Sequence, residues 1–215
     1  MKEKQLFALG VGHFTPVLID LAEQCGYEVV GLYHYNDDRT NEIDHGLTIY
    51  GSFKDLFASG NLENMNFLLT MGDNTIRSQM IEKISSMGGN IPTLIHPAAV
   101  ISRFSKISSI GVYIDAFSQI QADTKIGEGT IIRTGVTICH TDSIGKYCFF
   151  AANVTIGAYT EVDDYVFVGQ GALSISSKVK HIGEYAYIGA RSLLTKDVAP
   201  HSFMCGSPAR ALKKV

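Results

Sequence analysis

Residues 111–170, GVYIDAFSQIQADTKIGEGTIIRTGVTICHTDSIGKYCFFAANVTIGAYTEVDDYVFVGQ, decide the fold of this chain. An aliphatic residue or phenylalanine returns at every sixth position for ten steps, namely at Ile114, Ile120, Ile126, Ile132, Ile138, Ile144, Phe150, Ile156, Val162 and Val168. Because 46% of the chain is hydrophobic, a run of this kind in one phase would arise by chance about four times in ten thousand. Neither the period of a helix nor that of a strand explains the spacing.

A six-residue period is typical of a parallel β-helix, in which each hexapeptide forms one short strand and one corner and the recurring aliphatic side chain points into the coil. Coils of about eighteen residues, stacked about 4.8 Å apart, predict about five to six coils after residue 97. Hexapeptide coils of this kind wind left-handed, against the usual crossover rule. The sequence therefore predicts an all-β left-handed parallel β-helix over residues 97–215.

Glycine follows several of the recurring residues, at Gly127, Gly145, Gly157 and Gly169. We expect these glycines to form the corners, because glycine adopts positive φ without a Cβ clash. Before the regular run, the spacing between aliphatic residues is seven, at Val100, Ile107 and Ile114. After the run, the gap from Val168 to Ile182 is two residues longer than two hexapeptides. We interpret residues 174–180 as a small loop that leaves the coil at a corner.

Residues 1–96 alternate between strand and helix patterns and predict an α/β, Rossmann-like domain. We expect buried strands at residues 6–9, 28–33, 47–50, 67–71 and 93–95. Helices are expected between Thr15 and Gly26 and over residues 75–87, the first with Thr15 as N-cap and Pro16 at the first helical position. The chain thus divides into residues 1–96 and 97–215.

Composition narrows the function. A net charge of −3 lacks the basic footprint of a nucleic-acid-binding protein. No apolar run approaches the roughly twenty residues that cross a bilayer, and no signal-peptide pattern opens the sequence. The four cysteines form no CxxC pair, which fits free thiols in a reducing compartment. We expect a soluble cytoplasmic protein that neither binds nucleic acid nor inserts into a membrane.

Two loops of the first domain are candidates for ligand binding. The Gly10-Val11-Gly12-His13 loop lies where a dinucleotide fingerprint would lie, although Thr15 replaces the third glycine. Strand two ends in Tyr33-His34-Tyr35 without a ribose-binding carboxylate, so hydride chemistry is disfavoured. A helix N-terminus can still hold a diphosphate, with a tyrosine stacked on the base. The alternative is a plain tight turn.

The second loop, residues 72–77, follows a strand that should end at the same edge of the sheet. We therefore expect it to face the same crevice as the glycine loop. The alternative is that Asp73 or Asn74 only caps the following helix, and both roles are compatible.

His140 lies two residues beyond inward-facing Ile138 and is expected at an exposed corner. A neutral imidazole there can act as a general base near pH 7, whereas the alternative is a surface histidine without a role. A zinc site made of histidines from neighbouring coils is disfavoured, because the next histidine in the coils is His181. We expect no metal.

These features together resemble the left-handed β-helix, hexapeptide-repeat sugar O- and N-acetyltransferases with an N-terminal Rossmann-like domain. This family includes the sialic-acid O-acetyltransferase-like proteins and the bacterial enzymes of polysaccharide biosynthesis that N-acetylate nucleotide-linked 4-amino sugars, of the bacillosamine-pathway type, and the chain resembles the latter. The resemblance covers essentially the whole chain, and the stretches that carry it are residues 10–13, 72–77, 96–102, 188–198 and 206–210.

The resemblance implies an acetyl-CoA-dependent N-acetyltransferase acting on a nucleotide-linked amino sugar, such as a 4-amino-4,6-dideoxy sugar. It implies a homotrimer with active sites between subunits and direct transfer with His140 as general base. The implied catalytic set is His140, Thr141 and Asp142. The implied acetyl-CoA contacts are Phe149, Ala158, Gly171, Gly189, Ala190 and Lys196, with an oxyanion-stabilising backbone amide near Ala158. The implied substrate contacts are Gly10, Gly12, His13, His34, Gly72 and Asn74.

Three positions depart from the family pattern. Thr141 stands where an acidic residue usually follows the catalytic histidine, and Asp142 is a candidate substitute. Phe149 replaces a second family histidine, and His34-Tyr35 replaces paired acids found in uridine-nucleotide users. The identity of the nucleotide (UDP, dTDP or GDP) is therefore open. O-acetylation of a sugar, or a binding or scaffold protein with a decayed site, are the alternative functions.

Overall fold

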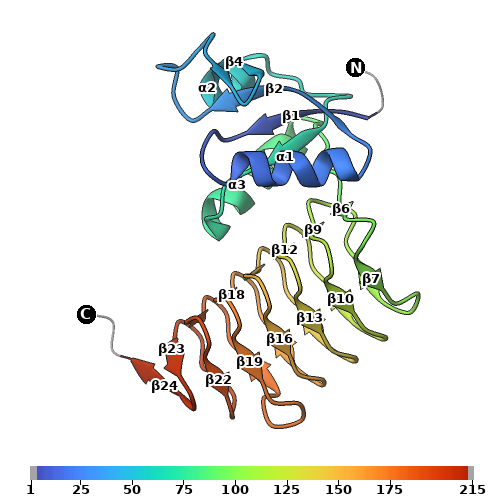
Figure 1. Cartoon of the computed structure of the whole chain (residues 1–215). Helices are drawn as coiled ribbons and strands as arrows, with labels where there is room; N and C mark the ends of the chain where they lie inside the picture. The colour runs from blue at the N-terminus through green and yellow to red at the C-terminus, as the bar shows by residue number, and fades with distance from the viewer. Residues whose placement is uncertain (1–3, 213–215) are drawn as a thin grey trace. The chain divides into compact units, whose positions relative to one another are not determined.

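The computed structural model describes residues 4–212 and divides the chain into two compact units, Met1–Leu94 and Ile95–Val215. Figure 1 shows the first unit as a sheet with helices and the second as a stack of coils. The predicted combination of an α/β domain with a left-handed parallel β-helix is confirmed. Within the described residues, none of the helices combines the length and apolarity needed to cross a bilayer.

The first unit is built on a five-stranded sheet in the order β3-β4-β2-β1-β5. Its elements are β1 (Gln5–Leu9), α1 (Thr15–Gln24), β2 (Glu28–His34), β3 (Ile43–Asp44), β4 (Leu47–Ser52), α2 (Phe53–Ala58), β5 (Phe67–Leu69) and α3 (Asn74–Ser86). Strands β1, β2, β4 and β5 are parallel, and only β3 runs antiparallel to its neighbour. Parallel strands bring the loops after β1 and β5 to one edge of the sheet.

Three details of this unit differ from the prediction. Helix α1 begins at Thr15 with Phe14 as N-cap, so the N-cap assignment of Thr15 is wrong; its hydroxyl binds the glycine loop instead. Helix α2 was not predicted, although Ser52 and Asp55 form a capping box that marks its start. Strand β3 was also missed, because two residues are too short to show a hydrophobic period, whereas its partner β4 corresponds to the predicted strand at residues 47–50.

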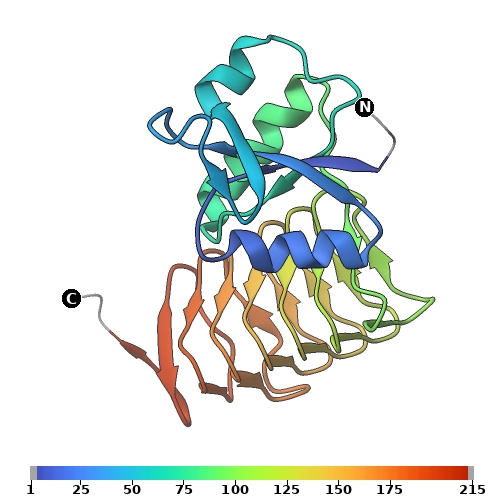
Figure 2. The same ribbon diagram turned by 45° about the horizontal axis from the view of Figure 1, so that its top comes forward.

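The second unit is a three-sided β-helix whose chain visits the same three sheets once per coil (Figures 1 and 2). Sheet one holds β7 (Val100–Ile101), β10 (Gln119–Ile120), β13 (Thr137–Ile138), β16 (Thr155–Ile156), β19 (Leu173–Ser174) and β22 (Leu193–Leu194). Sheet two holds β8 (Lys106–Ile107), β11 (Lys125–Ile126), β14 (Ser143–Ile144), β17 (Glu161–Val162) and β20 (His181–Ile182). Sheet three holds β6 (Leu94–Ile95), β9 (Tyr113–Ile114), β12 (Ile131–Ile132), β15 (Phe149–Phe150), β18 (Phe167–Val168), β21 (Tyr187–Ile188), β23 (Phe203–Gly206) and β24 (Ala209–Leu212).

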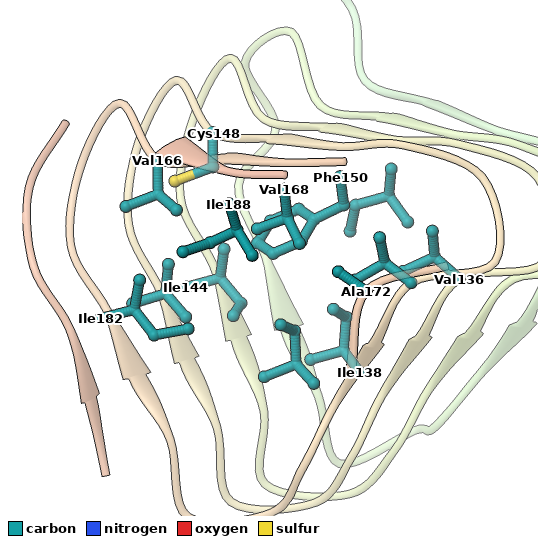
Figure 3. Packing of buried hydrophobic residues seen from close by; sticks show 14 of the residues in the cluster. Val136, Ile138, Ile144, Cys148, Phe150, Val166, Val168, Ala172, Ile182 and Ile188 are labelled. Atoms are coloured by element: carbon teal, nitrogen blue, oxygen red, sulfur yellow. The ribbon is translucent and has the colours of Figure 1, made fainter. Parts of the chain in front are cut away.

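The recurring aliphatic residues fill the coil interior, as the period predicts. All ten positions from Ile114 to Val168 are at most 3% exposed. Parallel pairing puts equivalent residues of successive coils above one another, for example Ile120, Ile138 and Ile156. Figure 3 shows Ile138, Phe150 and Ile188 among the side chains that gather in the interior of the coils. Burying each large aliphatic side chain contributes about 1.5–3 kcal/mol.

The glycines that follow the aliphatic residues do not serve the purpose we expected. Gly127, Gly145, Gly157 and Gly169 do not have positive φ. The positive φ lies two residues later in each corner, for example at Thr141 and Tyr159. Glycine is required for a different reason, namely the close approach of the next coil: a Cβ on Gly127 would lie 2.5 Å from the carbonyl oxygen of Gly145.

The start of the β-helix differs from the sequence interpretation. Ile101, not Val100, is the inward residue, because Ile101 pairs with Ile120 while Val100 is 62% exposed. The Leu94–Ile95 strand, predicted for the α/β sheet, belongs to sheet three of the β-helix. Ile95 lies six residues before Ile101, so the repeat begins earlier than the sequence showed.

The end of the repeat contains the expected loop. Ser174 keeps the six-residue phase and is 3% exposed, which places a polar residue in an aliphatic column. The loop follows it and returns to the coil at β20, where Ile182 pairs with Val162. The antiparallel β23–β24 pair lies at the end of sheet three.

The close approach of coils predicts that Gly127→Ala is strongly destabilising. The added Cβ meets the backbone of Gly145, which cannot move without breaking the ladder, so we expect a loss of about 1–3 kcal/mol in the free energy of unfolding. Chemical denaturation measures it. Gly72→Ala is the matched control, because its Cβ would meet nothing within 4 Å. Equal stability of the two variants would contradict the packing argument.

Candidate active site

The first unit contains a cavity of about 350 Å³ at the carboxyl edge of its parallel strands. It is lined by the glycine loop, Gly10–Thr15, by Thr70 and Met71 after β5, and by Tyr35, Phe53 and Ile76. The structure thus places both candidate loops at one cavity. The volume falls in the range of small-ligand sites, and the wall opposite the glycine loop is largely apolar.

Two buried threonines hold the glycine loop. Thr15 Oγ1 lies 3.0 Å from Thr70 Oγ1 and accepts a hydrogen bond from the Gly12 amide at 3.0 Å. Gly10 has φ +111°, and a Cβ there would lie 2.5 Å from Thr70 Oγ1. Gly10, Thr15 and Thr70 therefore depend on one another. Together they hold the loop in place, although the third glycine of a dinucleotide fingerprint is absent.

Of the other predicted substrate residues, His13 is part of the cavity lining, whereas His34, Gly72 and Asn74 are not. His34 is buried, and its Nδ1 lies 2.5 Å from Asn36 Oδ1. Asn74 Oδ1 accepts a hydrogen bond from the buried Arg77 at 2.8 Å, and Gly72 O lies 3.4 Å from Arg77. His13 lines the cavity and is exposed.

Three apolar side chains of this cavity, those of Phe53, Met71 and Ile76, were not predicted from the sequence. Phe53 follows β4 directly and Met71 follows β5 by two residues. Their position after parallel strands could have indicated them, because such positions gather at one sheet edge.

In the β-helix, His140 lies at the corner between sheets one and two and is exposed. Its Nδ1 lies 3.2 Å from the hydroxyl of Thr141, which has φ +62°. The ring also meets the edge of Tyr159 from the next coil, with 5.1 Å between centroids. Thr141, the corner residue with positive φ, is therefore the hydrogen-bonding neighbour that orients the imidazole of His140.

Asp142 points into the coil and makes no hydrogen bond with His140 among the described residues. It is 2% exposed; its Oδ1 accepts from the Thr160 amide at 2.9 Å, and its Oδ2 has no partner. It occupies an interior column in which hydroxyls donate to a carbonyl of the next coil, as Thr124 does to Cys139 O at 2.7 Å. Burial raises the pKa of Asp142 to about 7, against the lowering effect of the Thr160, Tyr159 and Cys139 amides.

The predicted oxyanion amide lies one coil beyond His140, at the same corner. Ala158 is buried, and its amide donates to the hydroxyl of Ser176 at 3.0 Å. The amide therefore has a partner in the free chain, and that partner comes from the loop after Ser174.

The other predicted acetyl-CoA residues lie in two places. Gly171, Gly189 and Ala190 form the corner between sheets three and one. Lys196 is exposed after β22 of sheet one. Phe149 lies on sheet three, with its ring stacked on Phe167 at 5.5 Å. Because His140 lies at the corner between sheets one and two, Phe149 is on the opposite side of the β-helix.

A second cavity of about 350 Å³ lies at the corner between sheets two and three. Its lining includes Glu161, Asp163, Asp164 and Glu184. Like charges disfavour the anionic phosphates of a nucleotide or coenzyme there, so we place neither in it. Across residues 4–212, no group of three or more His, Cys, Asp or Glu side chains could hold a metal ion.

Each of the two units contains a segment that matches a known family model. Residues 5–84 match the PglD N-terminal domain, and residues 111–140 match the bacterial transferase hexapeptide (six repeats). A UDP-3-O-acylglucosamine N-acyltransferase of Methylobacterium nodulans is 38% identical over 92 residues, which is 43% of this chain and 26% of that protein. The chain therefore spans about a quarter of the length of this relative.

Two solved structures share the whole fold. The acetyltransferase domain of PglB from Neisseria gonorrhoeae, in complex with acetyl coenzyme A, has a TM-score of 0.86 at 25% identity, covering 97% of this chain and 99% of that one. PerB from Caulobacter crescentus, in complex with CoA and GDP-perosamine, has a TM-score of 0.86 at 24% identity, covering 97% of both. The chain has the two-unit fold of these acetyltransferases from end to end.

The burial of Asp142 predicts a pH-dependent stability. An unfolded aspartate has a pKa of about 3.9, so a folded value of about 7 means that the native state favours the protonated acid. Its contribution is greatest below about pH 4 and is lost as the pH rises to about 7. Asp142→Asn should therefore raise the free energy of unfolding by about 2–4 kcal/mol at pH 8.

Denaturation at a series of pH values measures this effect, and the difference from the parent chain should close towards pH 4. Asp123→Asn is the matched control, because Asp123 is exposed at the same corner of the preceding coil. A variant of Asp142 that is less stable than the parent at pH 8 would show that the buried carboxylate is favourable.

Proposed function

We propose that this chain is an acetyl-CoA-dependent N-acetyltransferase that acts on the amine of a nucleotide-linked amino sugar. The observation that carries the proposal is the exposed His140, oriented by Thr141 at 3.2 Å and one coil from the Ala158 amide, within a two-unit fold. The same fold, at 25% identity and over 97% of the chain, is that of an acetyltransferase domain in complex with acetyl coenzyme A.

His140 is the general base in this proposal. With Nδ1–H donating to Thr141 Oγ1, the Nε2 lone pair is available to the sugar amine. The amine nitrogen forms a bond to the thioester carbonyl carbon, and His140 takes the proton that the nitrogen loses. The tetrahedral intermediate then expels the CoA sulfur, which leaves as a thiolate and receives that proton. The products are the amide and CoA with its free thiol.

The neutral Thr141 favours an amine over a hydroxyl as acceptor. A carboxylate beside Nδ1 would stabilise the imidazolium and strengthen the base, whereas a hydroxyl only orients the ring. An amine is the better nucleophile and depends less on proton removal than a sugar hydroxyl does. This argues for N-acetylation over the O-acetylation alternative.

The nucleotide is assigned to the cavity of the first unit. The N-terminus of α1, behind Gly10–Phe14, carries the partial positive charge that binds a diphosphate. The base would lie against the apolar wall, where Tyr35 is 71% exposed and close to Phe53 in the lining. In this proposal Tyr35, rather than the His34 expected from the sequence, contacts the nucleotide, because His34 is buried.

Acetyl-CoA is assigned to a cleft between two copies of the chain in a homotrimer. Gly171, Gly189 and Ala190 border sheet one on one side, and His140 and Ala158 border it on the other. Phe149, on sheet three, lies on the other side of the corner that carries Gly171, Gly189 and Ala190. Flat sheets with exposed aromatic residues such as Tyr187, which is 44% exposed, are suited to such burial.

The proposal predicts that His140→Ala lowers kcat by about 10²–10⁴-fold, because the base is lost, while the oligomeric state and thermal stability persist. Thiol release from acetyl-CoA, measured against UDP-, dTDP- and GDP-linked 4-amino sugars, is the assay. His181→Ala, a half-exposed histidine paired with Asp163, is the control. Near-normal turnover in His140→Ala would exclude this mechanism, and absent acetyl-CoA binding by calorimetry would favour a scaffold protein.

The role of Thr141 predicts a shift of the pH–rate profile. Thr141→Asp restores a carboxylate beside His140 at a position with positive φ that aspartate tolerates. The carboxylate stabilises the imidazolium, so the acid limb of kcat/KM should move to higher pH by about one unit. Thr141→Val keeps the shape without an acceptor and should lower kcat without that shift. An unmoved acid limb in Thr141→Asp would show that this residue does not orient His140.

A further inference from the structure

The corner after Ile156 is built differently from the equivalent corner of the preceding coil. In a regular corner, the amide that follows the inward residue donates to the inward residue of the next coil, as Cys139 does to Ile156 O at 3.0 Å. At the corner after Ile156 this pattern stops. The Gly157 amide donates to the side chain of Ser174 at 2.8 Å, and the Ala158 amide donates to the side chain of Ser176 at 3.0 Å.

The two-residue insertion explains this change. The next coil leaves the regular path after Ser174 and forms a longer corner over residues 175–180. The hydroxyl of Ser174 then takes the place of the backbone carbonyl for the Gly157 amide, and the hydroxyl of Ser176 accepts from the Ala158 amide. Ser174 is 3% exposed and occupies an otherwise aliphatic column. Its hydroxyl is buried and binds the Gly157 amide, so its role in the structure of the corner explains its presence.

Ser176 differs from Ser174 in its surroundings. It is an exposed residue, and its Oγ accepts the Ala158 amide at 3.0 Å. Among residues 4–212, its own O–H donates to no acceptor within hydrogen-bond distance. A hydroxyl that accepts from a buried amide and presents a free proton to the outside is polarised towards donation.

We propose that Ser176 is a catalytic residue whose hydroxyl donates to the carbonyl oxygen of the acyl thioester, while its oxygen keeps the hydrogen bond from Ala158. The proposal rests on the proposed function and deepens it. The oxyanion donor of this chain is then a side chain held by the amide of Ala158, rather than that amide itself.

The chemistry of the transfer is unchanged by this assignment. As the sugar nitrogen bonds to the carbonyl carbon, negative charge grows on the carbonyl oxygen, and the hydroxyl of Ser176 donates to it without losing its proton. When the C–S bond breaks, the charge leaves with the sulfur. His140, Ala158 and Ser176 lie at the same corner of three successive coils, so the base and the donor lie on the same edge of the helix, with the Ala158 amide between them.

Steady-state kinetics of Ser176→Ala tests the proposal. Removing one oxyanion donor costs about 10²-fold in kcat, so we expect a loss of that order with a KM for acetyl-CoA within about twofold of the parent. Ser176→Thr keeps the hydroxyl and should retain most of the activity. Ser177→Ala is the matched control from the same loop, because no interaction of the Ser177 side chain with the described residues is present.

Two outcomes would overturn the proposal. An unchanged or raised kcat in Ser176→Ala would show that the Ala158 amide binds the acyl oxygen directly once the hydroxyl is gone. A raised KM with normal kcat would show that Ser176 only holds the cofactor in the ground state. Thermal unfolding of each variant establishes that the corner still folds.

The proposed function fails in a distinguishable way. If the parent chain releases no thiol with any nucleotide-linked amino sugar, or His140→Ala is fully active, the acyl-transfer assignment itself is wrong. If the parent chain is active and depends on His140, but Ser176→Ala is unimpaired, only the assignment of Ser176 is wrong.

Discussion

The second unit depends on one constraint, which is that each coil must lie within backbone hydrogen-bonding distance of the next on all three sides. Glycine after the inward residue follows from it, because a Cβ on Gly127 would lie 2.5 Å from Gly145 O. The burial of the ten recurring residues follows as well, because stacked coils leave space inside only for columns of similar side chains. The corners, with positive φ at residues such as Thr141, follow from the short strands between them.

The residues to which we assign chemical roles lie at the corners of the coils or at positions that depart from the six-residue repeat. His140 is exposed at a corner of the coil, where the edge of the Tyr159 ring contacts its imidazole, and Thr141 is beside it because the corner turns there. Asp142 is an interruption of a hydroxyl column, and its raised pKa of about 7 is the consequence of an acid in an apolar coil. Ser174 and Ser176 are a second interruption, where two hydroxyls accept from the Gly157 and Ala158 amides at the corner that faces the insertion. Because the coils stack in register, the position of each of these residues relative to His140 is fixed.

Much of the fold could be predicted because its signals are local and repeated. The six-residue period, the loop after Ser174 and the exposed corner of His140 all follow from spacing alone. The strand at Leu94–Ile95 and the inward role of Ile101 could not, because they depend on which coil each residue pairs with. Helix α2 was missed although its capping box is visible in the sequence. At the cavity, the glycine loop was found, but the apolar wall of Phe53, Met71 and Ile76 combines residues far apart in the chain.

The sequence by itself determined the two-unit architecture, the placement of a histidine at a coil corner and the glycine loop at the head of α1, because periods and turn residues act over short distances. Only the tertiary structure decided what each of these residues touches. It showed that Thr141, not Asp142, contacts His140, that Asp142 is buried with one oxygen unpaired, and that the Ala158 amide binds Ser176. These contacts join residues of successive coils or of the two sides of a corner, and the direction of a side chain at a corner depends on the packing of the coils above and below it.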